Sequence, residues 1–248
     1  MDKNSNSYIF IYASFMVIVV AMVLSSVSGA LKPLQLKNKK MEKEQNILSS
    51  IGITATPEEA TSLYLENVKK EIVVDLDGNV VSIYADGKFE IGDVRAFDIN
   101  LKKQYSAISD GSKGELPIFV IEQDGKTFYI FPVLGKGLWG PIWGNVALES
   151  DLNTVYGANY GHEGETPGLG AEIADPPFSD KFKGKQIFDD QGNFVSVAVV
   201  KGGVANQSAI LPSHGVDGIS GSTLTCNGVT DMLHHSLSLY VEYIKKNK

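Results

Sequence analysis

Apolar residues divide the chain into a continuous N-terminal run and a longer region of mixed pattern. No charged residue lies between Asn4 and Leu31, and this segment contains the apolar run YIFIYASFMVIVVAMVL. Its length suits a helix that crosses a membrane. A cleaved signal peptide is the alternative because small residues (SSVSGA) follow, but the run is long for a signal and only Lys3 precedes it as a basic side chain. We therefore expect a retained anchor.

This pattern predicts an N-terminal tail over residues 1–7, a transmembrane helix over 8–31, a linker over 32–45 and one domain over 46–248. Five lysines follow the span between residues 32 and 43. Taken alone, the positive-inside rule would keep the domain in the cytoplasm. Long domains can cross the membrane regardless of such charge, so the lysines do not decide the orientation.

Helical spacing is expected at three places after the span. Pro33 is expected to end the spanning helix, and the Lys/Glu-rich stretch after it is typical of a short amphipathic helix. The segment TPEEATSLYLENVKKEI predicts a second helix, with Thr56 as N-cap and Glu59 at the capping-box position. A third helix is predicted from about Thr223 to the C-terminus, since apolar residues recur there at helical spacing.

Strand patterns dominate the middle of the chain. The segments EIVVDLDGNVVSIYA and PIFVIEQDGKTFYIFPVLG each place two apolar runs around an Asp/Gly turn, and QIFDDQGNFVSVAVVKGG repeats the pattern. The expected fold class is α+β, an antiparallel sheet with flanking helices that follows one transmembrane helix.

Charge and cysteine content exclude several kinds of function. The formal net charge is -7 over 248 residues, whereas nucleic-acid binding depends on clustered basic residues, so no nucleic-acid partner is expected. Cys226 is the single cysteine, and the sequence has no Cys/His cluster with metal-ligand spacing. We therefore expect no metal site, and redox chemistry would need an organic cofactor.

The stretch DGISGSTLTCNGVTD, at the start of the predicted C-terminal helix, is the strongest candidate for chemistry. Its glycines permit tight backbone geometry and its hydroxyl residues precede a helix N-terminus, which attracts phosphate. A simpler interpretation is that Ser220 or Ser222 only caps the helix. The residues alone leave both interpretations open.

The segment from Asp217 to Thr223 resembles the flavinylation motif Asp-x-x-Ser/Thr-Gly-Ala-Thr, in which a periplasmic flavin transferase joins FMN to the last Thr through a phosphoester. Two further segments, GLWGPIWG and HEGETPGLGAE, resemble other signatures of the FMN-binding domain in the C subunit of the sodium-translocating NADH:quinone reductases. The three motifs occur in the family's order, and the resemblance covers nearly the whole chain.

The resemblance assigns roles to individual residues. Thr223 would carry FMN covalently, and Asp217 would be recognised by the transferase. Ser222 departs from the family's usual Ala, which affects only how efficiently the transferase reads the site. The resemblance places the remaining cofactor-binding residues beside the FMN: Ser220, Gly221, Ser222, Trp139, Glu165, Thr166, Gly168 and Leu169. No residue is assigned a catalytic role of its own.

The implied function is electron transfer within a sodium-pumping NADH:quinone oxidoreductase. The chain lacks a dinucleotide fingerprint, so NADH and quinone would bind to other subunits of the complex. Its partners would be those subunits, the flavin transferase and membrane lipid. The location of the transferase implies a domain on the periplasmic side of a bacterial inner membrane. The G subunit of the related ferredoxin:NAD oxidoreductase complex and a non-redox, membrane-anchored binding domain are the alternatives.

Overall fold

The computed structural model describes residues 5–248, which form two units that are described separately. The first unit ends at Lys43, and the second comprises Glu44–Lys248. Helix α1 (Asn6–Ser49) supplies the first unit and contributes its last turns to the second. The first four residues of the predicted tail 1–7 lie outside the described part of the chain.

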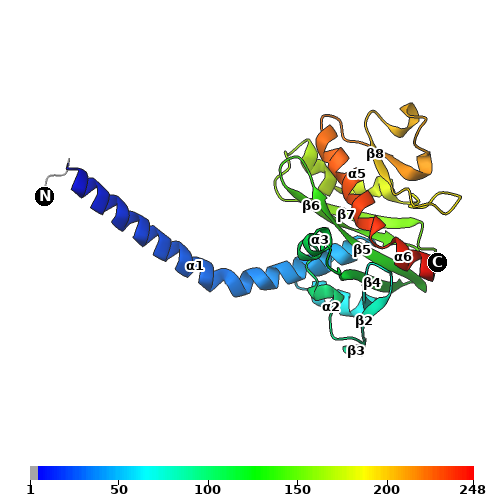
Figure 1. Cartoon of the computed structure of the whole chain (residues 1–248), viewed down its shortest axis with the longest axis horizontal. Helices are drawn as coiled ribbons and strands as arrows, with labels where there is room; N and C mark the ends of the chain where they lie inside the picture. Colours follow the sequence, from blue (N-terminus) through cyan, green and yellow to red (C-terminus); the bar gives the residue numbers. More distant parts are fainter. Residues whose placement is uncertain (1–4) are drawn as a thin grey trace. The chain divides into compact units, whose positions relative to one another are not determined.

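Within the described residues, α1 is the one helix long and apolar enough to cross a membrane. The predicted helix end at Pro33 is wrong, because α1 continues through this residue (Figure 1). A proline inside a helix removes one backbone hydrogen bond and perturbs the helix locally. The flanking stretches GALK and LQLK are rich in residues with good helix propensity, which keep the helix continuous.

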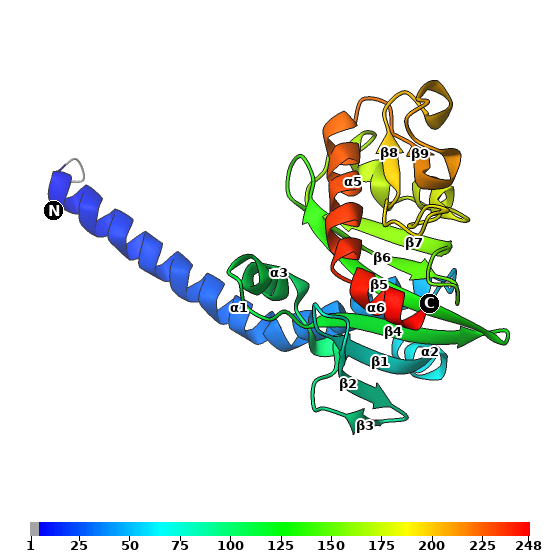
Figure 2. The ribbon, with the colours of Figure 1, turned by 45° about the vertical axis from the view of Figure 1, so that its right-hand side comes forward.

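The second unit is built on a seven-stranded antiparallel sheet with the strand order β3-β2-β1-β4-β5-β6-β7 (Figure 2). Its strands are β1 (Val68–Val74), β2 (Val80–Ala85), β3 (Lys88–Ile91), β4 (Leu116–Gln123), β5 (Lys126–Lys136), β6 (Pro141–Leu148) and β7 (Val155–His162). A separate parallel pair joins β8 (Ala198–Val200) to β9 (Gly215–Asp217). The predicted α+β class with an antiparallel sheet is confirmed.

Two of the three predicted hairpins form. β1 pairs with β2 around a turn that contains Gly78, and β4 pairs with β5 around Asp124-Gly125. Gly78 and Gly125 have φ values of 74° and 73°, which glycine adopts without strain.

The third predicted hairpin forms only as a single antiparallel bridge, between Phe188 and Phe194. The turn itself closes, because the amide of Asp189 donates to the carbonyl of Asn193 at 3.0 Å. The amides of Val195 and Ser196 then both donate to the carbonyl of Ile187, and Ser196 has a φ of 62°. The chain therefore bends away before a regular ladder can form, and the next strand is β8.

The helices of the second unit differ from the predicted ones in their limits. The chain forms helices α2 (Ala60–Asn67), α3 (Leu101–Ser109), α4 (Pro176–Ser179), α5 (Thr223–Ser238) and α6 (Val241–Asn247). Short 3₁₀ turns lie at η1 (Ala96–Asp98), η2 (Gly170–Ala174), η3 (Asp180–Phe182), η4 (Val204–Asn206) and η5 (Pro212–His214).

Two of these limits correct the sequence prediction. The predicted second helix is too long, because its last residues, VKKEI, belong to β1 and pair with β2 and β4. The predicted C-terminal helix is interrupted after Ser238 and resumes as α6. Tyr240 lies at this interruption, where its buried hydroxyl donates to the carbonyl of Pro117 at 3.1 Å.

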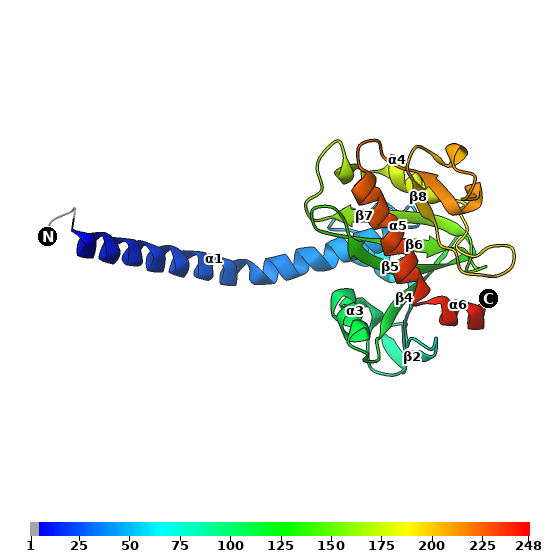
Figure 3. The ribbon, with the colours of Figure 1, turned by 45° about the horizontal axis from the view of Figure 1, so that its top comes forward.

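Both faces of the sheet are covered. Helix α5 lies across β5 and β6 on one face (Figures 2 and 3). The last turn of α1 packs on the other face with α2 and η1. β4 serves both cores, since Ile118 faces the α5 side and Phe119 faces the opposite side. Burial on both faces accounts for the continuous apolar run of β4.

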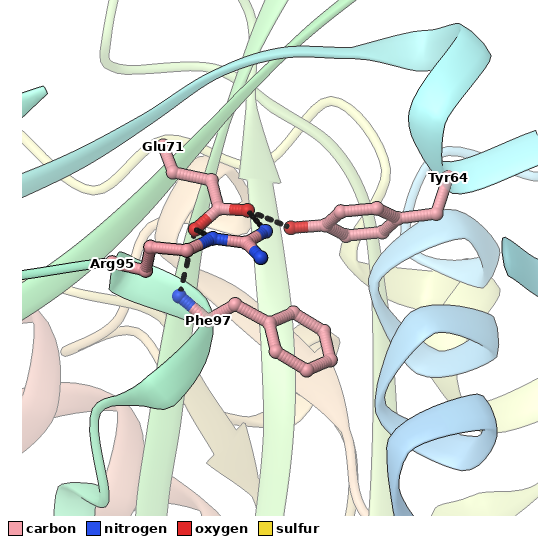
Figure 4. Close-up of polar contacts among 4 residues, drawn as sticks. All are labelled: Tyr64, Glu71, Arg95 and Phe97. Carbon is pink, nitrogen blue, oxygen red and sulfur yellow. Dashed lines mark hydrogen bonds and ion pairs between the residues drawn. The ribbon is translucent and has the colours of Figure 1, made fainter. Parts of the chain in front are cut away.

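A buried carboxylate organises the face opposite α5. Glu71 accepts hydrogen bonds from the Tyr64 hydroxyl at 3.0 Å and from the Phe97 amide at 3.0 Å, and it forms an ion pair with Arg95 (Figure 4). The Arg95 guanidinium also lies 4.3 Å from the centre of the Tyr84 ring. These contacts join α2, β1, β2 and the loop that leads into η1.

Candidate functional site

The candidate site lies at the N-terminus of α5. Strand β9 leads into a short loop, in which Gly221 adopts a φ of 79°, and Thr223 is the first residue of the helix. The carbonyl of Ser222 accepts the amide of Cys226 at 2.9 Å, so Ser222 occupies the N-cap position. The first amides of a helix have no intrahelical acceptor and are available to an anion.

The Ser222 hydroxyl does not act as an ordinary helix cap. Its Oγ makes no capping hydrogen bond and is buried without a hydrogen-bond partner among the described residues. A buried hydroxyl without a partner costs free energy, and such atoms in folded proteins call for an explanation. The interpretation of this stretch as a simple serine cap therefore loses support, since Ser220 is exposed and also makes no capping bond to the first turn.

Two hollows flank Thr223. One, of about 140 Å³, lies on the side of the GETPGLG segment, and the other, of about 430 Å³, lies on the side of Asp217. The smaller hollow is lined by Leu138, Glu165, Thr166, Leu169, Gly170, Gly221, Ser222, Thr223, Leu224 and Thr225. The larger is lined by Lys201, Gly202, Gly203, Asp217, Gly218, Ile219, Ser220, Gly221, Thr223 and Cys226. Thr223 and Gly221 are common to both.

The structure thus brings most of the predicted residues together. Six of them meet at the smaller hollow, whereas Ser220 and Asp217 lie at the larger one. Trp139 and Gly168 line neither hollow but belong to the turns at the rim of the smaller one. Sequence reasoning missed four lining residues of the smaller hollow: Leu138, Gly170, Leu224 and Thr225.

An exposed apolar rim surrounds the smaller hollow. The side chain of Leu224 is 60% exposed and that of Trp139 is 66% exposed, and Leu138 and Leu169 are also exposed. Large apolar side chains gathered at a hollow mark a surface that binds something. Leu224 directly follows Thr223, and this adjacency was the signal in the sequence that could have identified it.

Asp217 is exposed, and the structure gives it two contacts. One carboxylate oxygen accepts the Val204 amide at 2.8 Å, and its carbonyl accepts the Lys181 ammonium group at 3.1 Å. These contacts hold the loop before α5 against η3 and η4.

Glu165 is the buried charged residue of the site, with 4% of its surface exposed. One carboxylate oxygen accepts the Trp139 amide at 2.9 Å, and the other accepts the Thr225 hydroxyl at 2.6 Å. The Glu165 amide donates to Nδ1 of His162 at 3.2 Å, so this ring nitrogen carries no proton. Both oxygens of the carboxylate are thus engaged by neutral donors of the protein.

Cys226 is a buried thiol on the inner side of α5. Its Sγ accepts the Ile219 amide at 3.3 Å, and burial raises the pKa of the thiol. A raised pKa lowers the thiolate fraction at neutral pH, so the thiol is a poor nucleophile. This residue packs the loop against the helix.

Comparison with known proteins identifies the family. A family model described as the FMN-binding domain matches residues 137–238, which contain every candidate residue named above. The C subunit of the Na(+)-translocating NADH-quinone reductase from Pseudomonas aeruginosa is 33% identical over 94% of this chain and 92% of its own length. The chain belongs to the family of C subunits of these reductases.

Other members of this family agree in sequence and in structure. The C subunit from Neisseria meningitidis serogroup B is 31% identical over 100% of this chain and 96% of its own. The crystal structure of the Parabacteroides distasonis protein superposes with a TM-score of 0.73 at 41% identity, covering 86% of this chain and 96% of that one. The Shewanella oneidensis structure gives a TM-score of 0.64 at 29% identity, covering 84% and 98%. Membership in this family makes the chain part of an NADH-quinone reductase and decides against the G subunit of the related complex.

Proposed function

We propose that the chain is the electron-transfer subunit of a sodium-pumping NADH:quinone oxidoreductase and that it carries FMN bound covalently to Thr223 through a phosphoester. The observation that carries the proposal is the position of Thr223, at the N-terminus of a 16-residue helix and between two hollows. When bound, FMN would accept and pass on electrons, and the chain would hold and orient it.

The surroundings of Thr223 fit a phosphate. The helix dipole and the free amides of the first turn favour negative charge at this point. The unpartnered Ser222 hydroxyl is a ready hydrogen-bond donor beside it, and Ser220 and Gly221 complete the loop. A phosphoester at Thr223 would thus satisfy groups that the protein alone leaves unsatisfied.

The shallow hollow explains why attachment would be covalent. Pockets that hold small molecules usually measure about 300–1,000 Å³, whereas the hollow beside GETPGLG measures about 140 Å³. A flat ring would cover the apolar rim of Leu138, Leu169 and Leu224 without being enclosed. Contact of this kind retains a ligand weakly, so a covalent tether would keep it in place. Trp139, Thr166 and Gly168 lie on the turns that border this surface.

The structure also supports a choice between the two threonines of the motif. Thr225 is 2% exposed and its hydroxyl already donates to Glu165. Thr223 is half-buried at the surface of the helix and lines both hollows. Thr223 is therefore the accessible hydroxyl, and the exposed Asp217 would serve in recognition by the flavin transferase.

The remaining roles would belong to partners. No dinucleotide fingerprint occurs in the sequence, so other subunits would bind NADH and quinone.

Residues 8–31 would form a single span in a bacterial inner membrane, residues 32–45 would form a linker, and the domain would face the periplasm. Proteolysis of intact spheroplasts tests this orientation, since a periplasmic domain is digested and a cytoplasmic domain is protected.

Flavin fluorescence on a denaturing gel tests the attachment. The full chain is expressed with a flavin transferase as wild type, Thr223→Ala and Thr225→Ala. We expect fluorescent wild-type and Thr225→Ala bands and a dark Thr223→Ala band. A dark wild-type band would contradict the covalent attachment of FMN.

A further inference from the structure

We propose that Glu165 is a positioning residue, whose buried carboxylate fixes the first turn of α5 against the turn between β5 and β6. This inference rests on the proposed attachment at Thr223. The carboxylate accepts one hydrogen bond from the Thr225 hydroxyl on the helix and one from the Trp139 amide on the turn. One side chain thus joins the helix turn that would carry the flavin to the apolar rim that would support it.

Helical geometry explains how a bond at Thr225 orients Thr223. Successive residues of an α-helix are rotated by about 100°, so residues two apart point to nearly opposite sides. The buried Thr225 hydroxyl donates to Glu165, whereas Thr223 is half-buried and lines both hollows. Holding Thr225 fixes the rotation of the first turn, where few intrahelical bonds hold it.

Three glycines show how tightly the carboxylate is enclosed. A Cβ atom at Gly170 would lie 2.5 Å from Oε2 of Glu165 and 2.6 Å from the Thr225 hydroxyl oxygen. A Cβ atom at Gly137 would collide with Oε1, and one at Gly228 would collide with the carbonyl of Lys136. Helix, turn and carboxylate therefore pack closely, and loss of the carboxylate removes a contact that both the helix and the turn make.

The role of hydrogen bonding at this position can be separated from that of charge. Both carboxylate oxygens accept hydrogen bonds from neutral donors of the protein. A glutamine can keep the arrangement, because its carbonyl oxygen can accept the Trp139 amide while its NH₂ group donates to the Thr225 oxygen. The proposed role therefore requires a side chain of this size that hydrogen-bonds to both groups, and it does not require a negative charge.

The test uses the full chain in detergent, prepared without and with the flavin transferase. Glu165→Ala and Thr225→Val break the connection, whereas Glu165→Gln and Thr225→Ser retain it. Glu163→Ala is the matched control, because Glu163 is exposed and only two residues away. Thermal unfolding of each variant establishes that it is folded at the measuring temperature.

The first readout is hydrogen exchange in the protein without flavin. We expect Glu165→Ala to raise the exchange rate of the Trp139 and Cys226 amides at least tenfold, and Thr225→Val to do so at Cys226. Glu165→Gln, Thr225→Ser and Glu163→Ala should stay within threefold of wild type. Unchanged exchange in Glu165→Ala would overturn the proposal, as would a Glu165→Gln variant that exchanges as fast as Glu165→Ala.

The second readout is the fluorescence anisotropy of flavin in the native, modified protein. It should fall in Glu165→Ala and Thr225→Val and remain at the wild-type value in the two conservative variants. Loss of anisotropy in Glu165→Gln alone would indicate that the charge acts on the flavin directly and would overturn the positioning role. A wild-type protein without covalent flavin would refute the attachment at Thr223, while the exchange measurement would still decide the role of Glu165.

Discussion

Two buried glutamates of the domain, Glu71 and Glu165, have surroundings that differ in one respect. Glu71 is 3% exposed and faces a cation, Arg95, as well as Tyr64 and a backbone amide. Glu165 is 4% exposed and accepts hydrogen bonds from a backbone amide and a threonine hydroxyl, both neutral. The negative charge of Glu71 is thus compensated by a cation, whereas Glu165 is held by hydrogen bonds from neutral groups.

The difference indicates what each carboxylate does. A buried charge opposite a cation becomes costly as soon as either partner is removed. Glu71 therefore holds α2 and the segment around η1 against β1. Glu165 lies beside the candidate flavin site, where a neutral glutamine could hydrogen-bond to the same two groups, accepting the Trp139 amide and donating to the Thr225 oxygen. Variants of Glu71 should therefore change mainly the stability of the domain, and variants of Glu165 mainly the position of the first turn of α5.

The largest effect is expected for Glu71→Ala. Removal of this carboxylate leaves the Tyr64 hydroxyl and the Phe97 amide without their acceptor and Arg95 without its counter-ion. Because Arg95 is partly exposed and can be solvated, we expect a loss at the lower end for buried pairs, about 3 kcal/mol, or roughly 6–12 °C in Tm. Thermal unfolding monitored by circular dichroism measures it, and fluorescence of the covalent flavin on a gel should persist.

The pair Glu71→Gln and Glu165→Gln sharpens the comparison. Glu71→Gln replaces charge-assisted bonds by neutral ones and should cost about 1–2 kcal/mol in the free energy of unfolding. Glu165→Gln should cost less than about 1 kcal/mol, because its donors are neutral. Urea unfolding of both variants in the full chain provides the values. A greater loss for Glu165→Gln would contradict the distinction between charge and shape.

The contacts that distinguish Glu71 from Glu165 could not be predicted from the sequence. The alternating apolar runs and the Asp/Gly turns predicted the sheet, and the motif ending at Thr223 located the helix start. Glu165 was predicted only as a neighbour of the flavin, because no spacing rule relates it to Thr225, 60 residues later. Such a contact arises from the packing of η2 against α5, which is a tertiary property.

The errors in helix limits have a related cause. Val68 continued the helical spacing of α2, but pairing with β2 and β4 draws this segment into β1. Pro33 was expected to end a helix because local propensity disfavours proline there, although the good helix formers around it sustain α1. Packing thus determines where β1 begins, whereas local helix propensity accounts for the continuation of α1 through Pro33.

A smaller effect is expected for Gly228→Ala on the backbone that encloses Glu165. The added methyl group would collide with the carbonyl of Lys136 and displace the helix from the turn. Overpacking costs about 1–3 kcal/mol, and the better helix propensity of alanine returns up to about 1 kcal/mol. We therefore expect a net loss of about 1–2 kcal/mol by thermal unfolding. Gly164→Ala is the control, because its Cβ would meet no atom within 4 Å.

The smallest effect at neutral pH is expected for Tyr64→Phe. It should cost about 1 kcal/mol or less in the free energy of unfolding, since Glu71 keeps its bonds to Arg95 and the Phe97 amide.

The effect that distinguishes this variant appears at alkaline pH. Burial and the neighbouring Glu71 raise the pKa of Tyr64 above that of an unfolded tyrosine, so its contribution is full below about pH 10 and declines as the pH rises further. The unfolded state then binds fewer protons than the folded state, which makes stability fall by up to about 1.4 kcal/mol per pH unit for this residue. Tyr64→Phe should remove that slope. The part that remains is due to other groups whose pKa values burial also raises: Tyr105, Tyr160, Tyr240, Tyr243 and Cys226. Urea unfolding from about pH 9 to 11, the range around the pKa of an unfolded tyrosine, tests this, and equal slopes in variant and wild type would mean that Tyr64 loses its proton without unfolding.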